Sequence, residues 1–100
     1  MIASIQSSLF ERMVALRRDL HRHPELSGQE RQTTDRLSQE LDRLGIAHHC
    51  PLETGLVAEI EGPPDLPAVA LRADIDALPI HEDTGLEFAS TVDGVMHACG

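Results

Sequence analysis

The last residues of the chain bring a thiol and an imidazole close together. In Met96-His97-Ala98-Cys99-Gly100, Cys99 stands two positions after His97 and directly before a glycine. Thiolate and imidazole are ligands of zinc and other divalent transition metals, and a small-residue turn lets the backbone bend to present such a ligand. We therefore predict that Cys99 is a metal ligand. His97 is either a further ligand or, as we favour, a neighbour that stabilises the thiolate.

Cys99 also has a purely structural interpretation. Free cysteine is among the most buried residue types and often behaves as a small apolar side chain. On that interpretation Cys99 would be a core residue. Its position between His97 and Gly100 favours the metal-ligand interpretation.

A second group of chemically active residues ends an apolar run. Residues 68–73 are nearly all apolar, which predicts a strand buried on both faces. The alternation of a strand would place Arg72, Asp74 and, if the strand continues, Asp76 on one side at its carboxyl end, where open α/β sheets bind ligands. One interpretation is an ion pair between Arg72 and Asp74. The other makes Asp74 a carboxylate that orients a metal-binding histidine or polarises a metal-bound water.

The remaining cysteine and histidines have mainly structural interpretations. Cys50 lies between a predicted helix and a predicted strand, which favours a surface or packing role, and a disulfide with Cys99 is not expected in a reducing compartment. His81 is expected to be a solvated loop residue. His21 and His23 could touch a substrate, but a role at the end of a helix and in the following turn is favoured.

Two amphipathic helices are expected before these residues. Pro24 should end the first helix, leaving His21 as its last histidine and His23 in the turn. The three arginines at positions 17, 18 and 22 are interpreted as part of a solvated face. The apolar stripe of the first helix consists of residues spaced three and four apart, namely Ile5, Leu9, Met13, Leu16 and Leu20.

The second helix has recognisable start and stop signals. Ser27-Gly28-Gln29-Glu30 has the pattern of a capping box, in which the serine accepts the Glu30 amide and the glutamate reaches back. Gly45 can adopt the left-handed conformation that ends a helix. Between these signals, the helix is expected to bury Leu37, Leu41 and Leu44.

After Gly45 the pattern changes to that of strands and loops. Alternation over residues 56–61 predicts a half-exposed strand, and the proline-rich residues 62–67 predict a loop. Residues 76–95 show no clear period and contain prolines, glycines and acids, which indicates a long ordered loop. Loops of that length in compact domains are usually functional or disordered.

Composition limits the class of protein further. One hundred residues allow one domain at most, and a net charge of −9 from 17 acids and 8 bases argues against binding to nucleic acid or an anionic membrane surface. No apolar run is long enough for a membrane span, and the first residues lack the features of a signal peptide. We therefore expect a cytoplasmic protein. The exposed edge and apolar faces predict poor solubility for the chain alone.

Three motifs together resemble the beginning of metal-dependent amidohydrolases that include hippurate hydrolase and the indole-acetyl-amino-acid hydrolases. The resemblance covers nearly the whole chain and implies an α/β fold. Residues 1–100 would be the N-terminal portion of a zinc-exopeptidase-like catalytic domain, with two helices followed by strands of a mostly parallel mixed sheet. The motifs are Asp19-Leu20-His21-Arg22-His23-Pro24-Glu25-Leu26-Ser27, Leu71-Arg72-Ala73-Asp74-Ile75-Asp76-Ala77-Leu78-Pro79-Ile80 and Met96-His97-Ala98-Cys99-Gly100.

The resemblance also implies an activity and a site. Family members are several times longer, carry a smaller lid domain through which they could form homodimers, and hydrolyse the amide bond of N-acyl amino acids with two divalent ions, often manganese, zinc or nickel. Cys99 matches a metal-ligating cysteine and Asp74 matches an acid that supports the metal centre. Arg72 stands where related peptidase branches carry a histidine ligand, so we do not assign it as one.

The resemblance places the rest of the site outside this sequence. A further ligand, a histidine, is expected two positions after Cys99, and the lid, the other ligands and the glutamate base have no counterpart in residues 1–100. The segment alone is expected to be inactive and to bind metal weakly. The alternatives are a non-catalytic acidic domain that binds a partner and, less favoured, a redox protein that uses Cys50 and Cys99.

Overall fold

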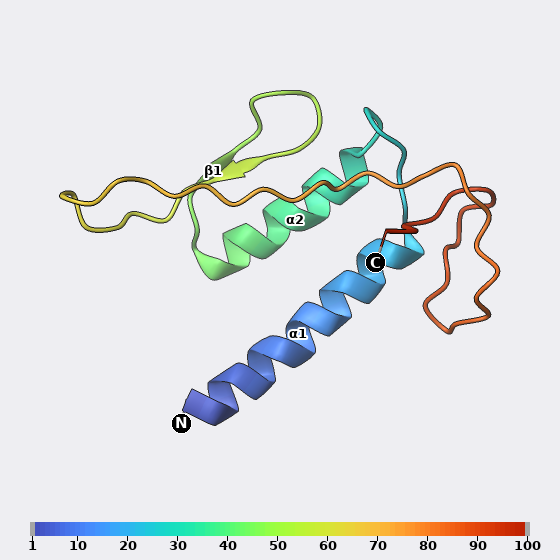
Figure 1. Ribbon diagram of the computed structural model, residues 1–100, viewed down its shortest axis with the longest axis horizontal. Coiled ribbons are helices and arrows are strands. Elements are labelled where there is room, and N and C mark those ends of the chain that lie inside the picture. Colours follow the sequence, from blue (N-terminus) through green and yellow to red (C-terminus); the bar gives the residue numbers. More distant parts are fainter. Residues whose placement is uncertain (1, 100) are drawn as a thin grey trace. The chain divides into compact units, whose positions relative to one another are not determined.

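The computed structural model describes residues 2–99 and divides the chain into two compact units. The first unit combines the N-terminal helix with the C-terminal loop, Met1–Pro24 and Ala77–Gly100, and the second is Glu25–Asp76. The elements in chain order are α1 (Ile2–Arg22), α2 (Arg31–Leu44), β1 (His48–His49) and β2 (Val57–Ala58). Figure 1 labels the first three of them. The α/β class predicted from the sequence is confirmed.

The predicted first helix and its end are confirmed in α1. The helix ends at Arg22, and the amide of His23 donates to the carbonyl of Leu20 at 3.2 Å before the chain turns into Pro24. The first half of the apolar stripe is exposed to solvent, whereas Leu16 and Leu20 are half-buried. The packing of α1 within its unit is therefore concentrated near its C-terminal end. No helix in residues 2–99 has the length and apolarity needed to cross a membrane.

The predicted capping box at the start of α2 is wrong. Glu30 occupies the N-cap without a side-chain cap bond, and its carboxylate accepts the amide of Gly28 at 2.7 Å instead. The cap comes from Glu25, whose carboxylate accepts the amides of Gln32 at 3.2 Å and Thr33 at 2.6 Å. A charged carboxylate is favoured at the positive end of the helix dipole and makes stronger hydrogen bonds than a serine hydroxyl.

The end of α2 follows the prediction, but its buried face does not. Gly45 has φ +69°, and its amide donates to the carbonyl of Asp42 at 3.0 Å. The buried side chains of the helix are Thr33 and Thr34. The leucines predicted to be buried have a different environment, since Leu37 and Leu41 are half-buried and Leu44 is exposed.

The second unit contains the only strand pair among residues 2–99. β1 and β2 are antiparallel, with His48 opposite Ala58 and His49 opposite Val57. Of the strand predicted for residues 56–61, only Val57 and Ala58 are present as a strand. The loop between the strands is tied to α2, because the amide of Gly55 donates to the Thr34 hydroxyl at 2.8 Å.

The buried strand predicted for residues 68–73 is wrong. These residues form neither helix nor strand, and all are exposed, with Leu71 97% accessible. A strand that is buried on both faces needs hydrogen-bonded neighbours on its edges and elements that cover its faces. Within residues 2–99 this segment has no ladder partner, so its apolar sequence has nothing to pack against.

The C-terminal part of the first unit is a long ordered loop, as predicted. Leu78 and Met96 form an antiparallel bridge, with hydrogen bonds of 2.9 and 3.1 Å between their backbones. Ala77, which precedes the bridge, is only 2% exposed. The bridge brings the two ends of the loop together, and the loop contains turns at Gly85 and Gly94 with positive φ.

Candidate metal-ligand segment

Cys99 lies three residues beyond the bridge that Met96 forms with Leu78. Its side chain is exposed and its thiol is free. The interpretation of Cys99 as a buried apolar residue is therefore wrong, and the thiol is accessible to a ligand. Gly100, which completes the predicted turn, lies outside the described residues.

Arg72 and Asp74 form the ion pair that the sequence suggested. Their Nη2 and Oδ1 atoms are 3.0 Å apart, and both side chains are well exposed. A surface pair of this kind contributes little to stability. Asp74 belongs to the second unit and Cys99 to the first, so the role of Asp74 at a metal centre stays a prediction.

The described residues do not assemble a complete metal site by themselves. Within residues 2–99, no three side chains among His, Cys, Asp and Glu are grouped closely enough to hold an ion. The donor chemistry of Cys99 fits a transition metal such as zinc, which accepts thiolate ligands. The segment therefore fits the role of supplying one ligand to a site whose other ligands come from elsewhere.

The ring of His97 lies next to the ring of His21 and is tilted relative to it. Their centroids are 6.4 Å apart, and the Nε2 atom of His97 is buried. His21 also packs edge-on against Phe88, with centroids 5.7 Å apart. His97 is thus packed against α1, and its predicted role beside Cys99 stays a prediction.

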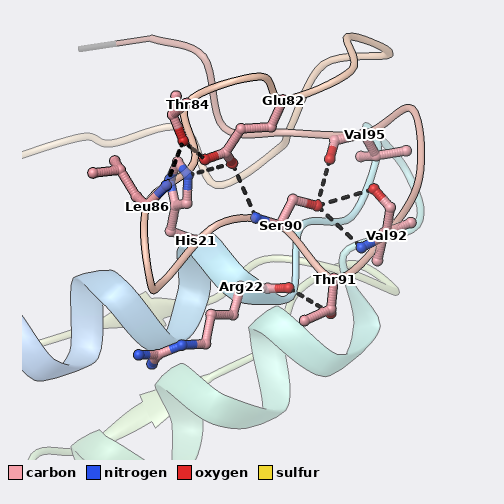
Figure 2. Close-up of polar contacts among 9 residues, drawn as sticks. All are labelled: His21, Arg22, Glu82, Thr84, Leu86, Ser90, Thr91, Val92 and Val95. Atoms are coloured by element: carbon pink, nitrogen blue, oxygen red, sulfur yellow. Dashed lines mark hydrogen bonds and ion pairs between the residues drawn. The ribbon is translucent and has the colours of Figure 1, made fainter.

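Glu82 is the centre of a polar network that the sequence analysis missed. Its side chain is only 3% exposed, and its carboxylate accepts hydrogen bonds from His21 Nε2 at 2.7 Å, from the Ser90 amide at 3.0 Å and from the Thr84 hydroxyl (Figure 2). The Thr84 hydroxyl, followed by the Ser90 amide, holds the pKa of Glu82 below its ordinary value, against the opposing effect of burial; His21 also lowers the pKa. The group is therefore a carboxylate at neutral pH.

Ser90 and Thr91 extend the Glu82 network along the loop. The Ser90 hydroxyl donates to the carbonyl of Val95 at 2.6 Å and accepts the amide of Val92 at 3.1 Å. Thr91 donates its amide and its hydroxyl to the carbonyl of Arg22, at 2.9 and 2.7 Å. Arg22 is the last residue of α1, so its carbonyl has no partner within the helix.

The end of α1 carries two further contacts from its own residues. The guanidinium of Arg18 lies 4.5 Å from the centroid of the Phe88 ring, so this arginine covers an aromatic face instead of only facing solvent. His23 Nδ1 lies 2.9 Å from the carbonyl of Asp19, which confirms its predicted role at the helix end.

The other predicted structural residues behave as expected. His81 is a solvated loop residue, with Nδ1 3.2 Å from the carboxylate of Asp93 and both side chains exposed. Cys50 is exposed and its thiol is free, like that of Cys99.

His21 differs from the prediction because it does more than end a helix: it joins α1 to the loop through Glu82.

Comparison with known sequences connects this segment to one family. The family model for Peptidase family M20/M25/M40 matches residues 70–100. The chain is 55% identical over 91 residues to an N-acetylcysteine deacetylase of Bacillus subtilis (strain 168), an alignment that covers 89% of this chain and 24% of that protein. It is 50% identical over 95 residues to an N-acetyl-L-cysteine deacetylase of the same strain, covering 94% and 23%.

Two crystal structures resemble the chain closely. The YXEP protein of Bacillus subtilis, described as a dinuclear metal binding peptidase from the M20 family, superposes with a TM-score of 0.88 at 53% identity, over 93% of this chain and 27% of that one. A putative aminohydrolase from methicillin-resistant Staphylococcus aureus superposes with a TM-score of 0.79 at 39% identity, covering 100% of this chain and 28% of that one.

The fold and the matches are consistent with a part of the α/β catalytic domain of metal-dependent hydrolases. The chain is similar to the N-terminal part of proteins of Peptidase family M20/M25/M40, and the resemblance drawn from its three motifs is confirmed. The chain spans about a quarter of the length of the relatives it matches.

Proposed function

We propose that the protein to which this chain belongs hydrolyses the amide bond of N-acyl amino acids at a centre of two divalent metal ions, and that Cys99 supplies one ligand. The observation that carries the proposal is the exposed Cys99 thiol at the end of a braced segment. Support comes from the matched residues 70–100 and from relatives named as deacetylases of an N-acetyl amino acid.

The chemistry of the proposed reaction divides between this segment and the rest of the protein. When bound, the metal pair polarises the amide carbonyl and favours deprotonation of the attacking water. Cys99 would bind as the thiolate. Asp74 would hold a ligand in place by accepting a hydrogen bond from it. The general base and the remaining ligands are expected from residues beyond Gly100.

The finer parts of the proposal concern substrate, metal and assembly. Hippurate-like substrates are proposed from the motif resemblance, and N-acetylated amino acids are an equally direct choice given the names of the relatives. Manganese, zinc and nickel are the proposed metals. A lid domain and a homodimer built through it are proposed for the whole protein.

The test uses the full-length protein that contains this segment. After metal removal, the protein is reloaded separately with manganese, zinc and nickel, and release of the free amino acid is measured from hippurate and from N-acetylcysteine. We expect at least one metal to restore hydrolysis of at least one substrate. Cys99→Ser should abolish most of that activity, whereas the matched variant Cys50→Ser, which changes the other exposed thiol, should retain it.

Two results would contradict the proposal. Failure of all three metals to support hydrolysis of either substrate would favour the non-catalytic acidic domain. Equal activity of the Cys99→Ser variant and the unchanged protein would remove Cys99 from the site.

A further inference from the structure

We infer that Glu82 is a positioning residue that acts through Ser90 to hold the Cys99 segment in place for the metal. This inference rests on the proposed function, because it assigns a support to the ligand proposed there. Glu82 lies in a loop, outside the motif that contains Cys99. Its network nevertheless leads to the residue directly before the 96–99 segment (Figure 2).

The first step is the anchoring of Glu82 on α1. Its carboxylate is almost entirely buried, which is costly for a charge unless hydrogen-bond donors surround it. An ionised carboxylate can only accept, so the Nε2 atom of His21 must carry the hydrogen in their 2.7 Å contact. His21 is fixed in turn by the helix and by the edge of the Phe88 ring. The carboxylate therefore has a defined position on a rigid element.

The second step transmits that position along the loop. Glu82 accepts the amide of Ser90, which fixes the backbone of Ser90 eight residues away. The Ser90 hydroxyl then donates to the carbonyl of Val95 at 2.6 Å, which is nearer than its other acceptor, the carbonyl of Val92 at 3.0 Å. The carboxylate is thus connected to Val95 through one backbone and one side-chain hydrogen bond. The first of these bonds is charge-assisted, because its acceptor is an ionised carboxylate, and such bonds are stronger than neutral ones.

The third step connects Val95 to the ligand. Met96 follows Val95 and is held on its other side by both backbone hydrogen bonds to Leu78. The segment that presents Cys99 is consequently braced on one side by Leu78 and just before it by Ser90. A ligand must be held closely to its productive position, and groups that orient ligands commonly affect metal affinity by about ten- to a hundredfold when they are changed.

The loop has a second anchor that does not use this route. Thr91 binds the carbonyl of Arg22 with its amide and hydroxyl. Thr91→Val removes the hydroxyl contact, keeps the amide contact and leaves Glu82, Ser90 and Val95 connected. This variant therefore serves as a control for destabilisation of the loop without loss of the positioning route.

The experiment measures cobalt binding to the full-length protein, because a cobalt-bound thiolate has a characteristic charge-transfer absorption band. The metal-free protein is titrated with Co²⁺, and Cys99→Ser identifies the part of the band that depends on Cys99. Glu82→Gln and Ser90→Ala are compared with Thr91→Val and with Glu87→Gln, which removes an exposed acid from the same loop. Thermal unfolding of each metal-free variant is recorded in parallel.

We expect Glu82→Gln and Ser90→Ala to weaken Co²⁺ binding by about tenfold and to alter the Cys99-dependent band. Thr91→Val should lower the Tm but leave Co²⁺ affinity and the band unchanged, and Glu87→Gln should change neither. Saturating metal should restore much of the hydrolysis lost in Ser90→Ala, with KM unchanged. If Glu82→Gln does not fold, Ser90→Ala alone tests the inference. This variant keeps the Ser90 amide that binds Glu82 and loses only the hydroxyl that binds Val95.

Three results would overturn the inference, and they are distinguishable. Absence of a Cys99-dependent band in the unchanged protein would reject the proposed role of Cys99, and the positioning role with it. A normal band and affinity in Ser90→Ala would reject the positioning role alone. If Thr91→Val weakened Co²⁺ binding as much as Glu82→Gln and Ser90→Ala do, any loosening of the loop would have the same effect. The specific positioning role of Glu82 would then be rejected.

Discussion

The Nε2 atom of His21 lies 2.7 Å from the carboxylate of Glu82, which joins two residues that are 61 positions apart. His21 belongs to the last turn of α1, and Glu82 belongs to the loop that follows Leu78, the residue bridged to Met96. The contact therefore closes the first unit on itself, because it ties the loop to the helix at a point where both are partly buried. Together with the Leu78–Met96 bridge and the Thr91 contacts to Arg22, this pair explains why a loop with no periodic pattern is ordered.

Replacement of His21 tests the importance of that closure. His21→Ala should lower the unfolding free energy, since loss of the ring packing against Phe88 alone is worth about 1 kcal/mol and the hydrogen bond to Glu82 is lost as well. His21→Gln, which retains a side-chain donor, should be less harmful. Urea unfolding measures both. His81→Ala is the matched control, because that histidine is exposed, and a loss as large as that of His21→Ala would contradict the assignment.

Gly45 provides a test of the helix end that is independent of the proposed activity. A Cβ at this position would meet no atom within 4 Å, so the cost of Gly45→Ala comes from its φ of +69° rather than from a clash. We expect a loss of about 1 kcal/mol in unfolding free energy, the usual penalty for a left-handed residue with a side chain. Gly62→Ala, which also has open space but no positive φ, should be neutral or slightly stabilising. Equal effects of the two variants would contradict this explanation.

The sequence predicted those features that depend on neighbours along the chain. The spacing of apolar residues and Pro24 located α1, and Gly45 located the end of α2, because a helix is determined by contacts three and four residues apart. The same local reasoning failed at the start of α2. Ser27 had the right spacing for a cap, but the stronger carboxylate of Glu25, eight residues before Thr33, took that position.

The features that failed or were missed depend on distant partners. The residues from Ala68 to Ala73 have the composition of a buried strand, yet a strand exists only when other strands bind its edges. Glu82 was equally hidden, since nothing in an acidic loop marks which acid will be enclosed by a helix and a serine amide. The predicted roles of Cys99 and Asp74 both stay predictions, because Cys99 shows only an exposed thiol and Asp74 belongs to the other unit.

Acid should destabilise the protein through two buried carboxylates. The pKa of Glu30 is lowered from its ordinary value of 4.5 chiefly by the Thr54 hydroxyl, and that of Glu82 is lowered from the same value chiefly by the Thr84 hydroxyl. Near pH 4.5 the unfolded chain therefore binds more protons than the folded one, so stability rises with pH. The contribution is complete above pH 4.5 and is lost as the pH falls through the lower folded-state values.

The pH dependence is measured by urea unfolding from about pH 6 to about pH 3. We expect the unfolding free energy to decline over the acidic part of this range. Glu82→Gln should flatten part of the decline, and addition of Glu30→Gln should flatten it further. A decline of the same size in the double variant would show that other groups cause it.

The accessibility of the two thiols gives the most direct test of where metal binds. Both Cys50 and Cys99 are exposed, so iodoacetamide should alkylate both in the metal-free protein. A metal-bound thiolate is no longer available as a nucleophile, and the proposed site therefore predicts selective protection of Cys99 when zinc is added. Cys50 is an internal control for general changes in reactivity. Peptide mass spectrometry measures both positions in one sample, and equal protection of the two thiols, or protection of Cys50 alone, would contradict the assignment of Cys99 as the ligand.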